Sequence, residues 1–268
     1  MPAADPVFNR DDLARRLAAA VREAGEFALT KFRSPLKNWI KGDHSPVSEV
    51  DIASNELLRA ALCDPAGEMG WLSEETEDDP KRLQKRRLWI VDPIDGTRSY
   101  IAGLPDWSIS AALVEDGRPV LAALFAPVED EMFLATAGGG ATYNGVPIRV
   151  TDGGADGARV AATASYLRRL QAQNDRVIGL PRIHSLALRL SRVAQGAIDA
   201  AFAANNAHDW DLAAADLLVH EAGGALTTFA GQALIYNQPF PVHPPLIAAG
   251  PKRRAALLAL MQDHPIPR

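Results

Sequence analysis

Residues 89–100 read WIVDPIDGTRSY and place Asp92 and Asp95 directly after an apolar run. The run predicts a buried strand, so both carboxylates are expected at its C-terminal edge, where loops build sites in open α/β sheets. Pro93 fixes its own φ at about −65°, and Gly96 permits a turn that is closed to residues with a side chain. Two carboxylates about 4 Å apart repel by about 4 kcal/mol at an effective dielectric constant near 20. Because a cation between them removes this cost, the segment indicates a metal site.

The candidate ligands in this segment are all oxygen atoms, from Asp92, Asp95 and the Ile94 carbonyl. Oxygen ligands favour Mg2+, with Mn2+ or Ca2+ as substitutes, and do not favour zinc. Gly96 and Thr97 would then open a helix whose free N–H groups face an anion, as at other helix N-termini that bind phosphate. An ordinary Asp-Pro-x-Asp-Gly turn is the alternative that these residues alone leave open.

The composition of the 268-residue chain is that of a globular protein, with 47% hydrophobic and 23% charged residues. Its formal charge of −5 and its lack of a basic block argue against binding to a nucleic-acid polymer. The longest apolar runs fall short of the roughly 20 residues of a membrane helix, and the N-terminus has no signal-peptide pattern. A single cysteine, Cys63, cannot form an internal disulfide. We therefore expect a cytoplasmic protein without an integral membrane segment.

The first half of the chain has the pattern of helices followed by a sheet. Apolar residues at helical spacing predict helices at 11–32 and 52–62. From residue 88 the pattern shortens to strands separated by turn signals such as Asp116-Gly117 and Asn144-Gly145. These residues predict an antiparallel meander.

The small polar stretch 151–158 is the best candidate for a domain boundary. After it, the pattern alternates between strands, expected at 159–165, 197–203 and 225–229, and helices, expected at 185–196 and 210–224. This alternation predicts an α/β half at 156–268 behind an α+β half at 1–155.

Five ordered motifs resemble those of the inositol monophosphatase superfamily. Its hallmark DP[IL]DGT stands unbroken at 92–97. The other matching stretches are SPVSEVD at 45–51, WLSEET at 71–76, GGGATYNG at 138–145 and WDLAAADLLVHEAGG at 210–224. The resemblance implies an α/β protein with the layered α-β-α-β-α sandwich of these sugar and inositol phosphatases, and it places most metal ligands in the N-terminal half.

The resemblance also implies a Mg2+-dependent phosphatase. One Mg2+ would be held by Glu74, Asp92 and the Ile94 carbonyl, and a second by Asp92, Asp95 and Asp211. A third, weaker ion would lie beside Glu74. Mn2+ would substitute for Mg2+, whereas Li+ and Ca2+ would inhibit.

By the same resemblance, Glu74 and the Thr97 hydroxyl would orient a metal-activated water that attacks phosphorus, and Asp51 would support Thr97. The N–H groups of Gly96 and Thr97 would stabilise the transferring phosphoryl group. Lys41 takes the place of the family's loop lysine and, like Asp95, would contact the substrate phosphate. Without the resemblance, the acidic run that contains Glu74 and Glu75 would be interpreted as a solvated loop. With it, we expect Glu74 to belong to the site and Glu75 to stay solvated.

The sequence motifs do not decide which of several phosphate esters is the substrate. Inositol monophosphatases carry a glutamate where this chain has Ala203 or Ala204. Arg98 after DGT and the LSEE form of the acidic motif are similar to bacterial 3′(2′),5′-bisphosphate nucleotidases of the CysQ type. Arg98 would pair with the second phosphate of adenosine 3′,5′-bisphosphate. His208 matches a histidine often found three residues before the last metal ligand and would contact the substrate, although a purely structural role fits it equally well.

We therefore favour adenosine 3′,5′-bisphosphate, hydrolysed to AMP and phosphate, over inositol 1-phosphate. Histidinol phosphate is the third candidate substrate. A metal-binding interaction module without enzyme activity is the alternative of a different class, and the presence of every acidic ligand argues against it. The resemblance further implies a homodimer.

Overall fold

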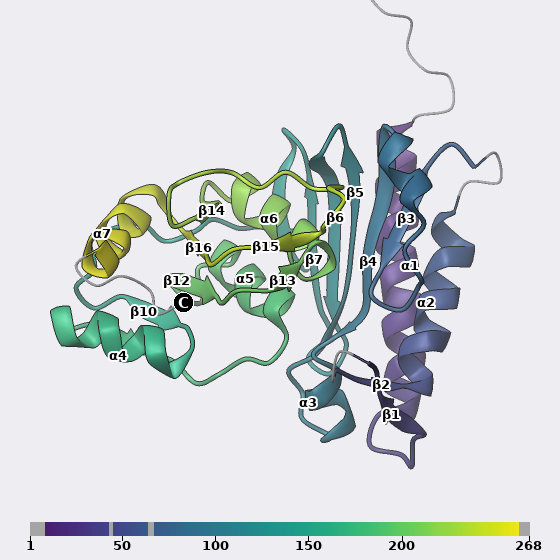
Figure 1. The fold of residues 1–268 in the computed structure, drawn as a ribbon, viewed down its shortest axis with the longest axis horizontal. Helices are drawn as coiled ribbons and strands as arrows, with labels where there is room; N and C mark the ends of the chain where they lie inside the picture. The colour runs from purple at the N-terminus through teal and green to yellow at the C-terminus, as the bar shows by residue number, and fades with distance from the viewer. Residues whose placement is uncertain (1–8, 43–44, 64–66, 263–268) are drawn as a thin grey trace, which may run out of the picture.

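Helices and sheets of the chain stack in five layers, α-β-α-β-α (Figure 1). The computed structural model describes residues 9–42, 45–63 and 67–262. Helices α1 (Arg10–Lys31) and α2 (Glu49–Leu62) cover one face of a seven-stranded sheet. Helices α5 (Leu186–Ala194) and α6 (Asp209–Glu221) lie between that sheet and a five-stranded sheet. The arrangement confirms the layered sandwich that the sequence predicts.

Helices α1 and α2 are amphipathic, as their residue spacing predicts. The apolar stripe of α1, which includes Leu17, Val21 and Ala28, packs on the seven-stranded sheet. Leu58 and Leu62 of α2 extend the same core. None of the helices in the described part of the chain is both long and apolar enough to cross a membrane.

The seven-stranded sheet has the strand order β3-β4-β5-β6-β7-β8-β9. Its strands are β3 (Gly70–Ser73), β4 (Arg87–Asp95), β5 (Ser108–Glu115), β6 (Arg118–Ala126), β7 (Glu131–Thr136), β8 (Gly140–Tyr143) and β9 (Val146–Pro147). Strands β4 to β9 form the predicted antiparallel meander. Both residues of the Asp116-Gly117 and Asn144-Gly145 turns have positive φ, as type I′ hairpin turns require. Strand β3, which the pattern did not predict, pairs parallel to β4.

The five-stranded sheet has the order β11-β10-β12-β16-β14. Its strands are β10 (Arg159–Ala161), β11 (Ile178–Gly179), β12 (Ala200–Ala203), β14 (Ala225–Thr228) and β16 (Leu246–Ala249). Helices α4 (Ala164–Gln173) and α7 (Pro251–Gln262) lie on its outer side (Figure 1). The strand expected at 159–165 ends at Ala161, because the Thr163 hydroxyl caps α4 by accepting the Tyr166 N–H.

The remaining elements are short and lie around the two sheets. They are the paired strands β1 (Asn38–Ile40) and β2 (Pro46–Ser48), the 3₁₀ helix η1 (Pro80–Gln84), helix α3 (Thr97–Ile101), and the paired strands β13 (Ala207–His208) and β15 (Val242–His243). Two of them matter for the site: α3 follows the DPIDGT segment, and β13 leads into α6.

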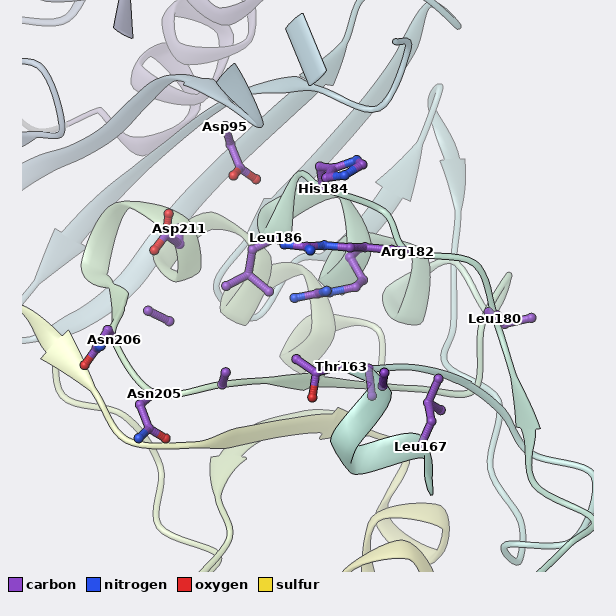
Figure 2. A pocket seen from close by; sticks show the side chains of 15 residues that line it. Asp95, Thr163, Leu167, Leu180, Arg182, His184, Leu186, Asn205, Asn206 and Asp211 are labelled. Atoms are coloured by element: carbon purple, nitrogen blue, oxygen red, sulfur yellow. The ribbon is translucent and has the colours of Figure 1, made fainter. Parts of the chain in front are cut away.

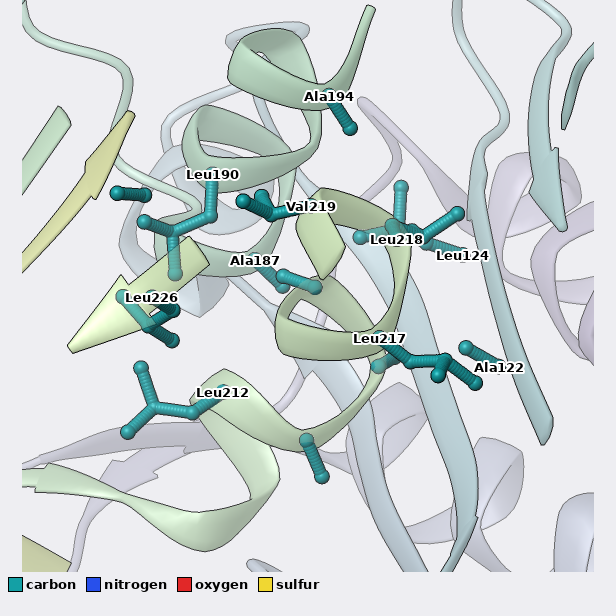
Figure 3. Close-up of a cluster of buried hydrophobic side chains, with 14 of the residues drawn as sticks. Ala122, Leu124, Ala187, Leu190, Ala194, Leu212, Leu217, Leu218, Val219 and Leu226 are labelled. Carbon is teal, nitrogen blue, oxygen red and sulfur yellow. The ribbon is translucent and has the colours of Figure 1, made fainter. Parts of the chain in front are cut away.

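Leucine and alanine side chains of α5 and α6 fill the space between the two sheets (Figure 3). Leu218 of α6, Leu124 of the seven-stranded sheet and Leu226 of the five-stranded sheet belong to one buried cluster. One continuous core therefore joins the predicted halves 1–155 and 156–268, and their division into two domains stays a prediction.

Asp216 on α6 is an acidic side chain outside the predicted metal site. Its carboxylate accepts a hydrogen bond of 3.0 Å from the Tyr236 hydroxyl. Burial raises the pKa of Asp216 to about 6, although the Tyr236 hydrogen bond opposes the shift. Because the folded protein then binds the proton more tightly than the unfolded chain, this contribution to stability is full below about pH 4 and is lost as pH rises through 6.

We expect Asp216→Asn to raise the free energy of unfolding by about 1 to 2 kcal/mol at pH 8, because the amide has no charge to bury and still accepts from Tyr236. At pH 4.5 the gain should nearly vanish, since Asp216 is then protonated in the folded wild type. Urea denaturation at the two pH values measures the difference. An equal gain at both would contradict the raised pKa.

Candidate active site

The end of β4 brings Asp92 and Asp95 to one point through an irregularity in the sheet. Residues three apart on a regular strand face opposite sides. The pairing of β4 with β5 shifts register between Asp92 and Asp95, and the Ile94 N–H donates to Asp92 Oδ1 at 3.1 Å. This break in the strand lets both carboxylates serve one site, as β-bulges do elsewhere.

The N-terminus of α5 holds Asp95. The Oδ2 atom of Asp95 accepts hydrogen bonds from the Ser185 hydroxyl at 2.5 Å and from the Ala187 N–H at 2.6 Å. Ser185 is also the N-cap of α5, because its hydroxyl accepts from the Leu188 N–H at 3.0 Å. One carboxylate oxygen of Asp95 is therefore fixed by a helix from the second half of the chain. Ser185 is not among the residues predicted for the site, although a serine directly before an apolar stretch at helical spacing, here LALRL at 186–190, is an N-cap signal.

The first turn of α6 carries Asp211 to the same place. Asp211 Oδ2 accepts from the His208 N–H at 2.7 Å and so forms part of the cap of α6. One oxygen from each of Asp92, Asp95 and Asp211 lies within 4.8 Å of the others. The fold thus brings together three of the predicted metal ligands.

These carboxylates have the chemistry of a cation site. Asp92 Oδ2 is buried and has no hydrogen-bond partner among the described residues. Burial and the nearby carboxylate charges hold the pKa values of Asp92 and Asp211 well above their usual range, and burial raises the pKa of Asp95 to about 6. A divalent cation would supply the missing partner of Asp92 and offset the repulsion, and an oxygen-only ligand set suits a hard cation. The residues therefore fit a divalent metal ion.

Glu74, which follows β3, lies near the three aspartates. Its negative charge contributes to the raised pKa values of Asp92, Asp95 and Asp211. The Nζ atom of Lys41 lies 3.0 Å from Glu74 Oε1, so the predicted loop lysine contacts the predicted metal ligand.

Glu75 differs from the expectation of a solvated side chain. Its side chain is only 4% exposed, and its Oε1 lies 2.6 Å from Lys41 Nζ. Burial raises the pKa of Glu75 to about 7, although Lys41 opposes the shift. The expectation was wrong because Lys41, directly after β1, forms ion pairs with both Glu74 and Glu75.

Thr97 and Asp51 form a buried pair at the start of α3. Thr97 Oγ1 lies 2.9 Å from Asp51 Oδ1 and 3.0 Å from the Ile94 carbonyl oxygen. The Ser48 N–H donates to Asp51 at 2.9 Å, in a capping box that begins α2. Because a hydroxyl has one proton, donation to Asp51 would leave the lone pairs of Thr97 free to accept a hydrogen bond.

A cavity of about 600 Å³ opens beside Asp95 and Asp211 (Figure 2). Its other walls come from the start of α4, from residues 180–189 and from residues 204–207. Two arginines, Arg182 and Arg189, line it, and neither belongs to a motif in the sequence. Ala204 lines it as well, so no carboxylate stands at that position of the wall.

Arg98 and His208, two of the predicted substrate contacts, are not among the described residues that line the cavity. Arg98 is exposed on α3. The ring of His208 stacks on Trp210 with 4.6 Å between the ring centroids, while its backbone N–H holds Asp211. Contact of Arg98 or His208 with substrate stays a prediction.

Comparison with known proteins identifies the family. The model of the inositol monophosphatase family matches residues 9–265. The chain belongs to this family. Inositol-1-monophosphatase of Rhizobium meliloti is 32% identical over 96% of this chain and 98% of that protein. Fructose-1,6-bisphosphatase/inositol-1-monophosphatase of Thermotoga maritima is 39% identical over 54% of this chain and 58% of its own length.

A solved structure agrees with this membership of the inositol monophosphatase family. The crystal structure of extragenic suppressor protein suhB from Bartonella henselae aligns with a TM-score of 0.83 and 26% identity over 95% of this chain and all of that one. Members of the family are metal-dependent phosphatases, and the chain is a phosphoric monoester hydrolase. The predicted family, fold class and enzyme class are confirmed.

Proposed function

We propose that this inositol monophosphatase family member is a Mg2+-dependent phosphatase of a small phosphorylated metabolite, with a 3′(2′),5′-bisphosphate nucleotide as its preferred substrate. The observation that supports metal-dependent hydrolysis is the convergence of Asp92, Asp95 and Asp211 within 4.8 Å beside a cavity. Glu74 and the Ile94 carbonyl would complete the ligands of two Mg2+ ions, with a third beside Glu74.

The chain's own residues would position the reactants. Bound metal ions would supply an activated water and stabilise charge on the phosphoryl group. The Thr97 hydroxyl, fixed by Asp51, and the Glu74 carboxylate would orient the attacking water. The N–H groups of Gly96 and Thr97, at the start of α3, would donate to the phosphoryl oxygens. Lys41 would fix the Glu74 carboxylate through their 3.0 Å contact.

The substrate preference depends on the cavity and not on the metal ligands. The side chain of Ala204 offers no acceptor for the ring hydroxyls of an inositol, which counts against inositol 1-phosphate. Inositol 1-phosphate is nevertheless the second candidate, because a curated relative named inositol-1-monophosphatase aligns over 96% of this chain. Histidinol phosphate is the third, and its cationic amine is disfavoured by the arginines of the cavity. The presence of all the acidic ligands counts against a non-enzymatic metal-binding module.

Phosphate release from adenosine 3′,5′-bisphosphate, inositol 1-phosphate and histidinol phosphate, with Mg2+ and with a chelator, tests the proposal. We expect turnover only with Mg2+, and a kcat/KM for the bisphosphate at least about tenfold above that for the other esters, because one charge-assisted contact accounts for about that factor. Absence of Mg2+-dependent release from every ester would refute the phosphatase function. A higher kcat/KM for inositol 1-phosphate would refute only the nucleotide preference.

The remaining properties that the family resemblance implies are part of the same proposal. Mn2+ would support turnover, and Li+ or Ca2+ would inhibit it by displacing Mg2+. We also propose a homodimer in the cytoplasm, with small phosphate esters as its only substrates. Size-exclusion chromatography with light scattering tests the homodimer directly.

A further inference from the structure

Arg182 and Arg189 line the cavity that also contains the predicted metal ligands Asp95 and Asp211. Arg182 lies between α4 and α5, and Figure 2 shows its side chain extending into the cavity from a wall other than those of Asp95 and Asp211. Arg189 belongs to α5, the helix whose N-terminus holds Asp95. One cavity is therefore lined by carboxylates and by two guanidinium groups.

These two guanidinium groups are unpaired within the described residues. Neither forms a hydrogen bond or an ion pair there, and the buried Nε atom of Arg189 has no partner. Burial lowers the pKa of Arg189, and the charge of Arg182 lowers it further, while Asp95 and Asp211 oppose the shift. Since the two guanidinium groups line one cavity and carry the same charge, they repel each other, and an anion between them would offset that repulsion.

Two other arginines with little exposure, Arg82 and Arg192, have counter-charges. Arg192, one turn further along α5, forms an ion pair with Glu131. Arg82, whose side chain is 1% exposed, lies 2.6 Å from Asp78. Because buried arginines are normally paired, an arginine without a partner on the wall of the cavity, as Arg189 is, indicates a ligand that comes from outside the chain.

We infer that Arg182 and Arg189 bind a second anionic group of the substrate, in the same cavity as the phosphate under attack. The inference rests on the proposed phosphatase function and moves the second-anion contact from Arg98 to these two residues. A guanidinium donates two parallel hydrogen bonds to a phosphate or a carboxylate, so both groups match the site.

The cavity also has room for the carbon skeleton that joins the two anions. Its volume of about 600 Å³ is that of a site for a nucleotide-sized ligand. Leu167, Leu180 and Leu186 provide apolar wall for a base or a sugar, and Thr163 and Asn205 provide hydrogen-bonding groups. The substrate class is accordingly a phosphomonoester with a second phosphate or a carboxylate, and not an ester with a cationic group.

Matched pairs of esters test this inference. Adenosine 3′,5′-bisphosphate and adenosine 3′-phosphate differ only in the second phosphate, and 3-phosphoglycerate and glycerol 3-phosphate differ in a carboxylate. For the wild type we expect, in at least one pair, a higher kcat/KM for the member that carries the second anionic group. The pair that shows this preference identifies whether that group is a phosphate or a carboxylate. Arg182→Met and Arg189→Met should each lower the ratio within that pair about 10- to 100-fold, mainly through KM, because a charge-assisted bidentate contact is lost.

Two further variants separate local from general effects. Arg168→Met removes an exposed arginine of α4 that does not line the cavity, and it should leave both ratios within about twofold of wild type. Arg98→Met tests the sequence-based expectation that Arg98 binds the second anionic group. Because Arg182 is exposed, Arg182→Met is expected to fold even where Arg189→Met does not.

The outcomes distinguish this inference from the proposed function. If the wild type hydrolyses esters with Mg2+ but in neither pair prefers the member with the second anionic group, the second-anion site is wrong and the phosphatase function stands. The same holds if Arg98→Met lowers the ratio and the Arg182 and Arg189 variants do not. If no ester is hydrolysed with Mg2+, the proposed function fails and the inference fails with it.

Discussion

Asp95→Asn is expected to lower the turnover of every phosphate ester by about 1,000-fold or more while the protein stays folded. The Asn side-chain carbonyl can still accept from Ser185 and Ala187, which donate to Asp95 at 2.5 and 2.6 Å, so the contact with α5 would survive. What the substitution removes is one negative charge from the cluster of carboxylates that would hold Mg2+. Steady-state phosphate release and thermal unfolding, both with Mg2+, measure the two effects.

Asp152→Asn is the matched control for this prediction. Asp152 Oδ1 accepts from the N–H groups of Lys252 and Arg253 at 2.9 and 3.0 Å, at the first turn of α7. It therefore repeats the contact of Asp95 with a helix N-terminus without the neighbouring carboxylates. We expect Asp152→Asn to keep wild-type turnover. Full turnover in Asp95→Asn, or equal losses in the two variants, would contradict the role of Asp95 as a metal ligand.

The elements that the sequence predicts well are those specified by local chemistry. Helix α1 follows from the spacing of residues such as Leu17 and Val21, and the hairpins of the seven-stranded sheet follow from Asn-Gly and Asp-Gly turns. The expected strand 159–165 was wrong beyond Ala161, because the Thr163 hydroxyl caps the N-terminus of α4. A threonine in an alanine-rich stretch fits a strand or an N-cap, and only the packing of α4 beside the five-stranded sheet decides between them.

The candidate site was predictable to different degrees along the chain. Asp92 and Asp95 could be identified from their position at the end of a strand. Asp211 could be added only through the family resemblance, because the spacing in the sequence does not show that α6 starts beside β4. Arg189 could not be identified at all: between Leu188 and Leu190 it reads as a charged residue of an amphipathic helix. Its place in the candidate site follows only from the fold, in which α5 lines the cavity.

Gly96→Ala is expected to lower both stability and turnover. Gly96 has a φ of +95°, which costs a residue with a side chain about 1 to 2 kcal/mol. A Cβ atom there would lie 2.9 Å from the Asp106 carbonyl oxygen and 3.2 Å from the Ser185 nitrogen, two backbone atoms that hydrogen-bond to each other at 3.3 Å. Relief of this overlap must move Ser185, and with it the carboxylate of Asp95. We expect a loss of about 2 to 4 kcal/mol in the free energy of unfolding and about 100-fold in kcat.

Gly223→Ala separates the backbone cost from the displacement of the site. Gly223 has a φ of +88°, close to that of Gly96, and a Cβ atom there would meet nothing within 4 Å. Since only the conformational cost applies, we expect Gly223→Ala to lose about 1 kcal/mol of stability and to keep wild-type kcat. Urea denaturation and phosphate release at saturating substrate compare the two variants. If both lose the same stability and both keep kcat, the contact of Gly96 with Ser185 does not fix the geometry of the carboxylates.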